Sequence, residues 1–562
     1  MNTNELILKA TGNHEHVQDD WMPVTAIRSI VFEDPAVIWL NYHGKSHKFA
    51  PDKETPYDFL KFIRTKGREF EEKWAKEILG EAIKVCQAPY DVRVVEHLEK
   101  TIHLIHEKVP VIVQPALWWK PERIYGVPDI IIHSAWLKEK FPDWLTDAEC
   151  DTESYYVFDL KFTTAIDSPK KQTDFKNYAA QIRIYSYILG YLQNSMPPMG
   201  FIISRDRIYN PLPVEINSML NEQLDTDLAG MRDHFLEIKL NGNKYVPWKD
   251  DVVKATISDD DEKWATAKKI IATEKTVGGD PVLVYKIGEE AKNTLQTLGF
   301  TSLQTLLANI PEPNILQRCR GIGEKTAKQI HSILQANGSK QAISPPQNLI
   351  PSKKKFEFFI DYEYFTNLNV NFEEQWPELQ GCSMIFMIGM GWEEELTWNF
   401  RTFVADKENY ASEKCIFEEF SDFLMEHTNG ELTTDAVFYH WSNPEVWQTR
   451  HVVERQGFSE DHPLRNLRLL DLEKIFLDGF AYIPGAWDYK LKHVAKALGE
   501  FSPQFETKWP GNLDRGLRAM VMGWKAYESE EPSESEEMKI LNTYLEADCK
   551  ALWNILRWVR SL

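Results

Sequence analysis

A chain of 562 residues is too long for a single hydrophobic core and predicts several domains. With 43% hydrophobic and 27% charged residues, it has the composition of a globular protein and not of a disordered or fibrous one. The net charge of −21 disfavours tight, nonspecific binding to nucleic acid, but whole-chain charge does not exclude a locally basic groove.

No apolar stretch approaches the length of a membrane span, and the N-terminus lacks a signal-peptide pattern, so we expect no membrane partner. The six cysteines are scattered without C-x-x-C pairs, which argues against a zinc ribbon. They are Cys86, Cys150, Cys319, Cys382, Cys415 and Cys549. We therefore expect a cytoplasmic, reducing location.

The first functional pattern is an amphipathic helix predicted over residues 58–79. Gly67, Glu71 and Trp74 fall on its apolar stripe, whereas Glu72 falls on the solvated side. A carboxylate on the inward face is a candidate for holding a metal or supporting a ligand that does. Simple packing of the helix is the alternative.

Residues 156–162 predict a buried strand in which Asp159 and Lys161 point to the same face. Charged groups in an apolar strand are costly unless a metal, a partner or a substrate satisfies them. Asp129 opens the preceding apolar run, residues 130–132. Two carboxylates and a cation are what metal-assisted phosphodiester hydrolysis needs. For an isolated D-x-K pattern, a structural ion pair is the more common explanation.

A further helix is predicted over residues 178–192, where Gln181 and Tyr185 share one face at i and i+4. An amide and a phenol at this place can hydrogen-bond a phosphate or the lysine.

Four motifs follow one another in this part of the chain: Gly67-x-x-Phe70-Glu71, Gly126-x-Pro128-Asp129, Asp159-x-Lys161 and Gln181-x-x-x-Tyr185. Over roughly residues 20–210, their order resembles the RecB-type branch of the PD-(D/E)xK nuclease superfamily. The resemblance implies a restriction-endonuclease-like α/β fold, a mixed sheet flanked by helices, with a Mg²⁺ or Mn²⁺ site.

By this resemblance, Asp129 and Asp159 are metal ligands, Glu71 is a supporting ligand, and Lys161 orients or activates water. Gln181 and Tyr185 match the motif that follows the core in this branch. Some relatives have His in place of Glu71, and others have Glu in place of Asp159. Some also hold an iron–sulfur cluster with four cysteines, but the scattered cysteines here lead us to expect none.

Residues 276–337 predict a small all-α domain with a Gly-Ile-Gly turn at 321–323 that opens a helix. Such a turn exposes backbone N–H groups at the positive helix end, where a phosphate can sit. The segment resembles a helix-hairpin-helix module, which implies contact with the DNA backbone. The candidate nucleic-acid-binding residues are Gly321, Gly323, Lys325, Thr326 and Lys328. Such modules also serve as protein–protein or interdomain spacers.

A Pro-, Ser- and Lys-containing stretch follows, and it marks the clearest domain boundary. We expect a nuclease domain over residues 1–275, a helical domain over 276–337, a linker over 338–355 and a further α/β domain over 356–562.

The last domain opens with a predicted strand that places Asp361 and Glu363 on one face. Near its end, Tyr544 and Asp548 lie one helical turn apart. This pattern resembles the DEDDy class of ribonuclease-H-like, DnaQ-like 3′–5′ exonucleases. The resemblance implies that the acidic residues hold two metals and that Tyr544 helps to position the attacking water.

The middle motif of that class matches imperfectly, because Glu445 stands where the class normally has Asp. We take Glu445 as the further metal ligand. Asp471 is a rival for this role, although its place at the start of the next element favours a structural role.

The three-part order resembles RecB-type nucleases of bacteria, archaea and viruses. It implies a metal-dependent nuclease acting on DNA, single-stranded or with free ends, in repair, recombination or phage- and defence-related processing. The sequence has no G-x-x-x-x-G-K-[ST] phosphate loop, so unwinding would need a helicase or another replication or repair partner. Two alternatives stay open: an RNA or RNA–DNA hybrid substrate, and a nucleic-acid-binding scaffold with one centre inactive.

Overall fold

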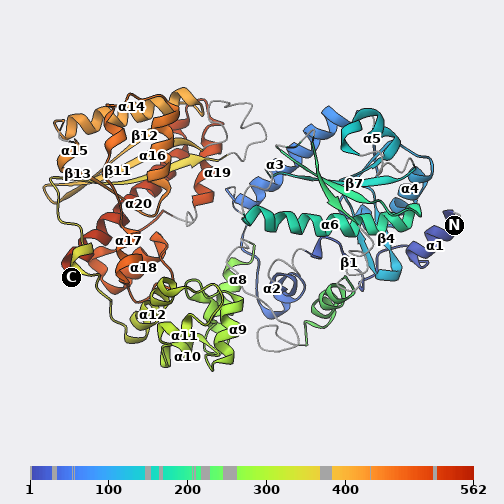
Figure 1. Cartoon of the computed structure of the whole chain (residues 1–562), viewed down its shortest axis with the longest axis horizontal. Coiled ribbons are helices and arrows are strands. Elements are labelled where there is room, and N and C mark those ends of the chain that lie inside the picture. Colours follow the sequence, from blue (N-terminus) through green and yellow to red (C-terminus); the bar gives the residue numbers. More distant parts are fainter. Residues whose placement is uncertain are drawn as a thin grey trace. The chain divides into compact units, whose positions relative to one another are not determined.

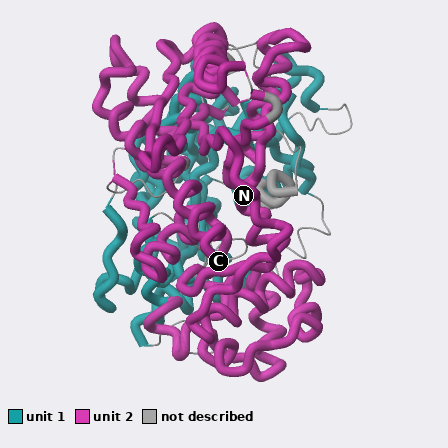
Figure 2. The backbone as a smooth tube through the Cα atoms, turned by 90° about the vertical axis from the view of Figure 1, so that its left-hand side faces the viewer, with its two compact units in different colours: residues 1–53, 63–271 teal, residues 54–62, 272–562 magenta. Residues whose placement is uncertain are grey.

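The computed structural model describes residues 3–27, 35–53, 55, 57–80, 82–145, 153–163, 169–205, 207, 210–216, 228–244, 263–366, 383–430, 432–510 and 516–562. The chain forms two compact units, coloured separately in Figure 2. The first comprises residues 1–53 and 63–271, and the second comprises residues 54–62 and 272–562. Each has its own mixed β-sheet. No helix within the described ranges is long and apolar enough to cross a membrane.

The first unit is built on a six-stranded sheet with the order β2-β3-β6-β7-β8-β9. These strands are Ile83–Lys84, Val111–Val113, Ile130–His133, Tyr155–Lys161, Met199–Ser204 and Leu212–Glu215. The strand predicted over residues 156–162 is β7, which runs antiparallel to β6 and parallel to β8. Its side chains are buried on both faces up to Lys161, so Asp159 lies inside the sheet layer.

Helices pack on this sheet, with α6 along β7 and β8 and α5 against β6, and further helices complete the unit (Figure 1). The helices are α1 Thr3–Thr11, α2 Pro35–Trp39, α3 Phe59–Trp74, α4 Val95–His106, α5 Ser134–Lys140, α6 Pro169–Gln193 and α8 Ala265–Ile270. The helix predicted over residues 58–79 corresponds to α3 and a following π-helical turn, Ala75–Leu79. The helix predicted over 178–192 is the C-terminal part of α6.

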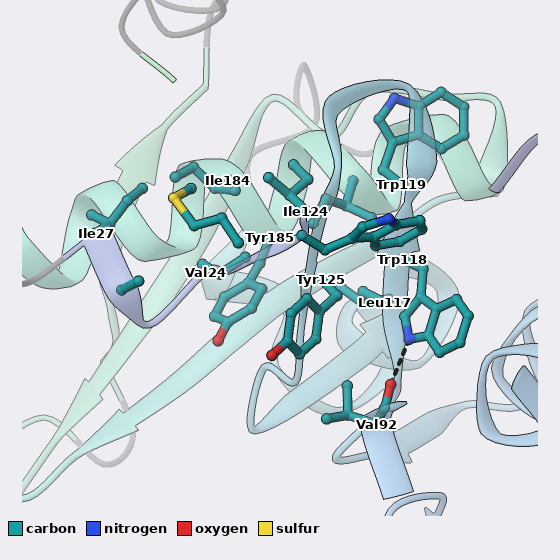
Figure 3. Close-up of a cluster of buried hydrophobic side chains, with 14 of the residues drawn as sticks. Val24, Ile27, Val92, Leu117, Trp118, Trp119, Ile124, Tyr125, Ile184 and Tyr185 are labelled. Atoms are coloured by element: carbon teal, nitrogen blue, oxygen red, sulfur yellow. Dashed lines mark hydrogen bonds between the residues drawn. The ribbon is translucent and has the colours of Figure 1, made fainter. Parts of the chain in front are cut away.

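A small sheet of β1 (Met22–Pro23), β5 (Ile124–Gly126) and β4 (Leu117–Trp119) packs with α6 into a core rich in aromatic residues. Figure 3 shows Trp118 donating its indole N–H to the carbonyl oxygen of Val92, with Tyr125 and Tyr185 in the same cluster. This core holds one side of α6, the helix that carries Gln181 and Tyr185.

The second unit contains a five-stranded sheet with the order β12-β11-β10-β13-β14. The strands in chain order are β10 Phe356–Phe365, β11 Met384–Glu394, β12 Thr397–Val404, β13 Ala436–His440 and β14 Leu469–Asp471. β11 runs antiparallel to both β10 and β12, whereas β13 runs parallel to both β10 and β14. β10 is therefore the central strand.

Alternate side chains of β10 enter two different cores. Phe358 and Ile360 pack with α14, whereas Phe359 packs with α20 and α18. The helices of this domain are α14 Tyr410–His427, α15 Leu432–Asp435, α16 Pro444–Arg455, α17 Glu473–Gly479, α18 Leu491–Phe501, α19 Gly516–Ala526 and α20 Glu536–Ser561. The sheet thus lies between two layers of helices, as the strand's period of two requires.

Residues 276–337, predicted to be all-α, form α9 Glu289–Thr297, α10 Leu303–Ala308, α11 Pro313–Leu316 and most of α12, Glu324–Ser339. They share one hydrophobic cluster with α17, α18 and α20. The segment predicted as a linker, residues 338–355, also makes ordered contacts in this unit. Ile343 and Tyr482 exchange two backbone hydrogen bonds of 2.9 and 3.0 Å, and the Arg560 guanidinium donates to the Pro351 carbonyl.

Gly200 in β8 provides a test of how tightly α6 packs on the sheet. A Cβ at this position would lie 2.4 Å from Cγ2 of Ile182 and 3.2 Å from the carbonyl oxygen of Val157. We therefore expect Gly200→Ala to lower the free energy of unfolding of the first unit by about 1–3 kcal/mol, measured by urea denaturation. Gly230→Ala is the control, because a Cβ there meets nothing within 4 Å. Equal stability of both variants and the wild type would contradict close packing at Gly200.

Candidate active sites

The second unit brings four acidic residues together around its central strand. Asp361 and Glu363 come from the C-terminal half of β10. Glu445 lies in the first turn of α16, directly after β13 ends, and Asp548 lies on α20. Glu363, Glu445 and Asp548 are 7%, 5% and 4% exposed, so these carboxyl groups are largely removed from water.

Burial and mutual repulsion dominate the electrostatics of this cluster. Burial, followed by the nearby Asp548 and Glu445, raises the pKa of Asp361 well above its ordinary value. The pKa of Glu363 is also raised well above its ordinary range, mainly by burial and then by Asp361. Burial raises the pKa of Glu445 to about 8. Carboxyl groups with this behaviour favour either a shared proton or a bound cation.

Tyr544 lies one turn before Asp548 on α20 and is held by a lysine from another helix. The ammonium of Lys492, on α18, donates to the Tyr544 hydroxyl at 2.6 Å and lies 4.1 Å from the centre of its ring. The same lysine favours the ionised forms of Asp548 and Glu363 and so opposes the burial that raises their pKa values. Lys492 is therefore a cation that the protein itself supplies to this cluster.

Two further side chains lie against the carboxylates. Trp509 donates its indole N–H to Oδ1 of Asp548 at 2.8 Å. His440, the last residue of β13, is fully buried, with Nδ1 3.3 Å from Oε2 of Glu445. The sequence patterns gave no role to Lys492, Trp509 or His440, because the motifs are defined by the spaced acidic residues and Tyr544 alone.

Asp471 takes part in the local backbone structure at the end of β14. Its Oδ1 accepts hydrogen bonds from the N–H groups of Ser442 and Glu473, each at 2.9 Å. These bonds secure the turn after β13 and the start of α17, which agrees with a structural role.

The donor set of this cluster fits a divalent cation. Oε2 of Glu445 is buried and accepts no hydrogen bond, and all four acids offer the oxygen ligands that Mg²⁺ and Mn²⁺ prefer. Within the described ranges, no group of three or more His, Cys, Asp or Glu side chains has the arrangement of a preformed metal site.

Residues 377–560 match the family model of the RNase H superfamily. This range contains Glu445, Lys492, Trp509, Tyr544 and Asp548, and it begins after the acids of β10. The match supports the predicted ribonuclease-H-like domain and suggests a nuclease of this nucleic-acid-hydrolysing superfamily. RNase H-like nucleases generally use divalent metal ions. A search of curated proteins finds no match to the chain.

The first unit brings a second set of charged side chains together. Asp129 precedes β6, and its Oδ2 accepts a hydrogen bond of 2.7 Å from the backbone N–H of Leu160 in β7. The ammonium of Lys161 lies 2.5 Å from Oδ2 of Asp159, whose side chain is 5% exposed. Burial, followed by the charge of Asp159, raises the pKa of Asp129 well above its ordinary value. Burial by itself would lower the pKa of Lys161. The carboxylates of Asp159 and Asp129 outweigh burial, and the net effect is a raised pKa.

Glu71 on α3 faces the same site. The Phe70 ring lies 6.2 Å from that of Phe162, directly after Lys161, which places this part of α3 over the end of β7. Glu71 is partly buried and interacts with the charges of Lys161 and Asp159, while burial raises its pKa. Three carboxyl groups beside one ammonium leave an excess of negative charge, and their oxygens are hard ligands, so this donor set also fits a divalent cation.

The helix α6 closes the site from one side. Tyr185 is 2% exposed, and the charges of Asp159 and Asp129 add to the burial that raises its pKa well above the ordinary value. Its ring packs so closely on Gly126 that a Cβ there would lie 2.6 Å from it. Gln181 is buried one turn earlier on the same helix. The structure thus brings Tyr185 close to the carboxylates and places Gln181 next to it along α6.

The predicted nucleic-acid-binding turn precedes α12. Gly321 has a φ of +82°, a conformation that favours glycine, and a Cβ on Gly321 or Gly323 would meet nothing within 4 Å. The turn is therefore open, and the first N–H groups of α12 have no partner within the helix. Lys325 pairs with Asp478 at 2.5 Å, and Lys328 pairs with Glu324 at 2.7 Å. Thr326 is partly buried in the first turn of the helix.

The buried acids of the second unit make stability depend on pH. The folded state retains a proton on Glu445 that the unfolded state, with a pKa near 4.5, releases, so the free energy of unfolding falls as the pH rises from about 4.5 to 8. In EDTA, we expect Glu445→Gln to raise Tm above wild type at pH 8.5, by about 3 °C or more, with a smaller difference at pH 5. Thermal unfolding followed by circular dichroism measures this.

The control is Glu454→Gln, also on α16, where the glutamate is half-exposed and pairs with Arg450. It should leave the pH dependence unchanged. A Glu445→Gln variant whose Tm follows the wild-type value at both pH values would contradict a buried, protonated acid.

Proposed function

We propose that this protein is a metal-dependent nuclease that hydrolyses phosphodiester bonds of DNA, with a 3′–5′ exonuclease centre in its ribonuclease-H-like domain. One observation carries the proposal. Asp361, Glu363, Glu445 and Asp548, separated by up to 187 residues of sequence, converge on one buried cluster beside Tyr544. Isolating so many carboxyl groups from water is unfavourable unless they keep protons or bind a cation, and a divalent cation would satisfy all four together.

In this centre, Asp361, Glu363, Glu445 and Asp548 would hold one or two Mg²⁺ or Mn²⁺ ions. Bound divalent metal would supply stabilisation of negative charge on the phosphate and a more acidic water. Tyr544 presents its hydroxyl at the edge of the cluster, where Lys492 fixes its direction. We infer that this hydroxyl orients the attacking water, and that Trp509 holds the Asp548 carboxylate in position.

A second centre is proposed in the first unit. Its support is the approach of Asp129, Asp159, Lys161 and Glu71 to one another, with Tyr185 at the same place. Asp129 and Asp159 would be the metal ligands and Glu71 a supporting one. The ammonium of Lys161 would orient water or neutralise the phosphate. Gln181 and Tyr185 would position the substrate strand.

The open turn before α12 is the proposed contact with the nucleic-acid backbone. Gly321 and Gly323 leave room for a phosphate to approach the N–H groups of the first helical turn. DNA with a single strand or a free end is the proposed substrate, presented by a helicase or another repair partner. An RNA substrate is the alternative, and matched DNA and RNA strands would separate the two.

The two proposed centres can be separated by substitution. We expect Asp361→Asn and Asp159→Asn each to remove one Mg²⁺- or Mn²⁺-dependent cleavage activity by at least about 100-fold, because each exchanges a charged ligand for a neutral amide of equal size. The assay is degradation of end-labelled single-stranded and duplex oligonucleotides with metal or EDTA. Asp435→Asn, at the end of α15, is a control substitution of the same kind. The proposal would be contradicted if the wild-type protein cleaved none of the DNA and RNA substrates.

Lys492 should act through Tyr544 as a positioning residue. We expect Lys492→Met to lower kcat of the exonuclease by about 10- to 100-fold with little change in KM, because Lys492 positions the Tyr544 hydroxyl and does not bind the substrate itself. Lys492→Arg should restore part of kcat because it retains a donor and a positive charge. Steady-state release of terminal nucleotides measures both. A loss that simply follows a lower Tm, with no rescue by arginine, would instead mean a structural role.

A further inference from the structure

A second feature of the RNase H-like unit has no part in the proposed hydrolytic centres. It is a cavity of about 520 Å³ between the end of α20, the segment before β10 and the β11–β12 hairpin. Its lining contains both aromatic and cationic side chains, among them Trp553 and Arg557 of α20. Aromatic and basic groups together are the usual composition of surfaces that bind single-stranded nucleic acid.

The charge of this cavity is opposite to that of the whole protein. Five cationic side chains but only two carboxylates line it, in a chain whose net charge is −21. The two carboxylates already have partners. Glu357 accepts two hydrogen bonds from the Arg560 guanidinium, at 2.5 and 2.8 Å, and Glu393 accepts one from the Trp553 indole N–H at 2.9 Å. The residues Lys353 to Lys355 supply three consecutive cations to the lining, and the Lys353 ammonium lies 3.6 Å from Oε1 of Glu393. An anionic ligand is therefore favoured.

Arg557 is held by aromatic contact. Its guanidinium carbon lies 4.3 Å from the centre of the Trp553 ring and 5.6 Å from that of Phe505. The Trp553 ring in turn lies 5.2 Å from that of Trp398. A guanidinium supported in this way is a flat cationic platform on which an unpaired base can stack. Arg557 itself is exposed, so a ligand can reach it.

The hairpin at the rim of the cavity is strained. Glu395 and Leu396 connect β11 to β12, and both have a positive φ, 48° and 66°, where side chains other than glycine and asparagine are unfavourable. The Leu396 side chain is 87% exposed. An exposed apolar side chain on a strained turn offers a contact for an apolar or aromatic ligand group, such as the face of a base.

The cavity lies along the same secondary-structure elements as the acid cluster. Phe359, which lines the cavity, is on the same face of β10 as Asp361, about 7 Å along the strand. Arg557 follows Asp548 on α20 by nine residues, about 13 Å of helix. The two sites are therefore separate but within the reach of one short oligonucleotide.

We propose that this cavity binds a segment of single-stranded nucleic acid, with a base stacked on Arg557 and phosphates beside Lys353–Lys355. The proposal deepens the nuclease function above and rests on it only for the identity of the strand. The site would hold the part of the substrate strand that is not being cleaved.

The test measures binding of a fluorescein-labelled dT20 strand to the full chain by fluorescence anisotropy, in EDTA so that no cleavage occurs. We expect Arg557→Glu to weaken binding by at least about tenfold, because it removes the platform and reverses its charge. The double substitution Lys354→Ala and Lys355→Ala should make the slope of log affinity against log salt concentration less steep. The change should be about 0.7 for each phosphate contact that is lost. Thermal unfolding checks that each variant folds.

Lys539→Ala is the matched control, since Lys539 is an exposed lysine near the other end of α20 that pairs with Glu534. Affinity of Arg557→Glu equal to that of the wild type, or an equal loss in Lys539→Ala, overturns the proposal. So does displacement of dT20 by a polyglutamate 20-mer at equal concentration, which would identify the site as one for acidic polypeptides. Arg557-dependent binding by a wild-type protein that cleaves nothing would contradict the nuclease function and leave this inference standing.

Discussion

Both units bury carboxyl groups inside apolar layers, and this constraint governs the chemistry of both candidate sites. A carboxylate removed from water must share a proton, face a cation or accept several hydrogen bonds. In the second unit, Asp361, Glu363, Glu445 and Asp548 meet under this constraint, and their raised pKa values are its direct consequence. Stability alone does not account for such an arrangement, since apolar residues of similar size would fill the same space without the electrostatic cost.

The two units balance this charge in different ways. In the first, the counter-charge is on the same strand: Lys161 lies two residues after Asp159 and contacts it directly. In the second, Lys492 comes from α18 and reaches the cluster through Tyr544, a residue of α20. The first arrangement is largely local, whereas the second requires two helices to be packed correctly. Its geometry is therefore more sensitive to how the domain folds.

The helical segment and the residues that follow it belong structurally to the second unit. Residues 276–337 share a hydrophobic cluster with α17, α18 and α20, and Asn337 accepts from the Gly485 backbone while donating to the Ala486 carbonyl. The proline-containing stretch before β10 packs against Gly479. The composition of this stretch is typical of a flexible linker. Composition alone cannot predict the contacts that the stretch makes with distant parts of the chain.

The sequence by itself determined the elements that carry the acids. Strict alternation placed Asp361 with Glu363 and Asp159 with Lys161, because a strand's side chains repeat every two residues whatever surrounds them. A helical period likewise joined Tyr544 to Asp548. Only the tertiary structure decided that Lys492 and Trp509 would complete the cluster and that Phe505 would lie against Arg557 beside a basic cavity. These contacts join elements that are distant in sequence, and no local period records which faces will meet when helices pack on a sheet.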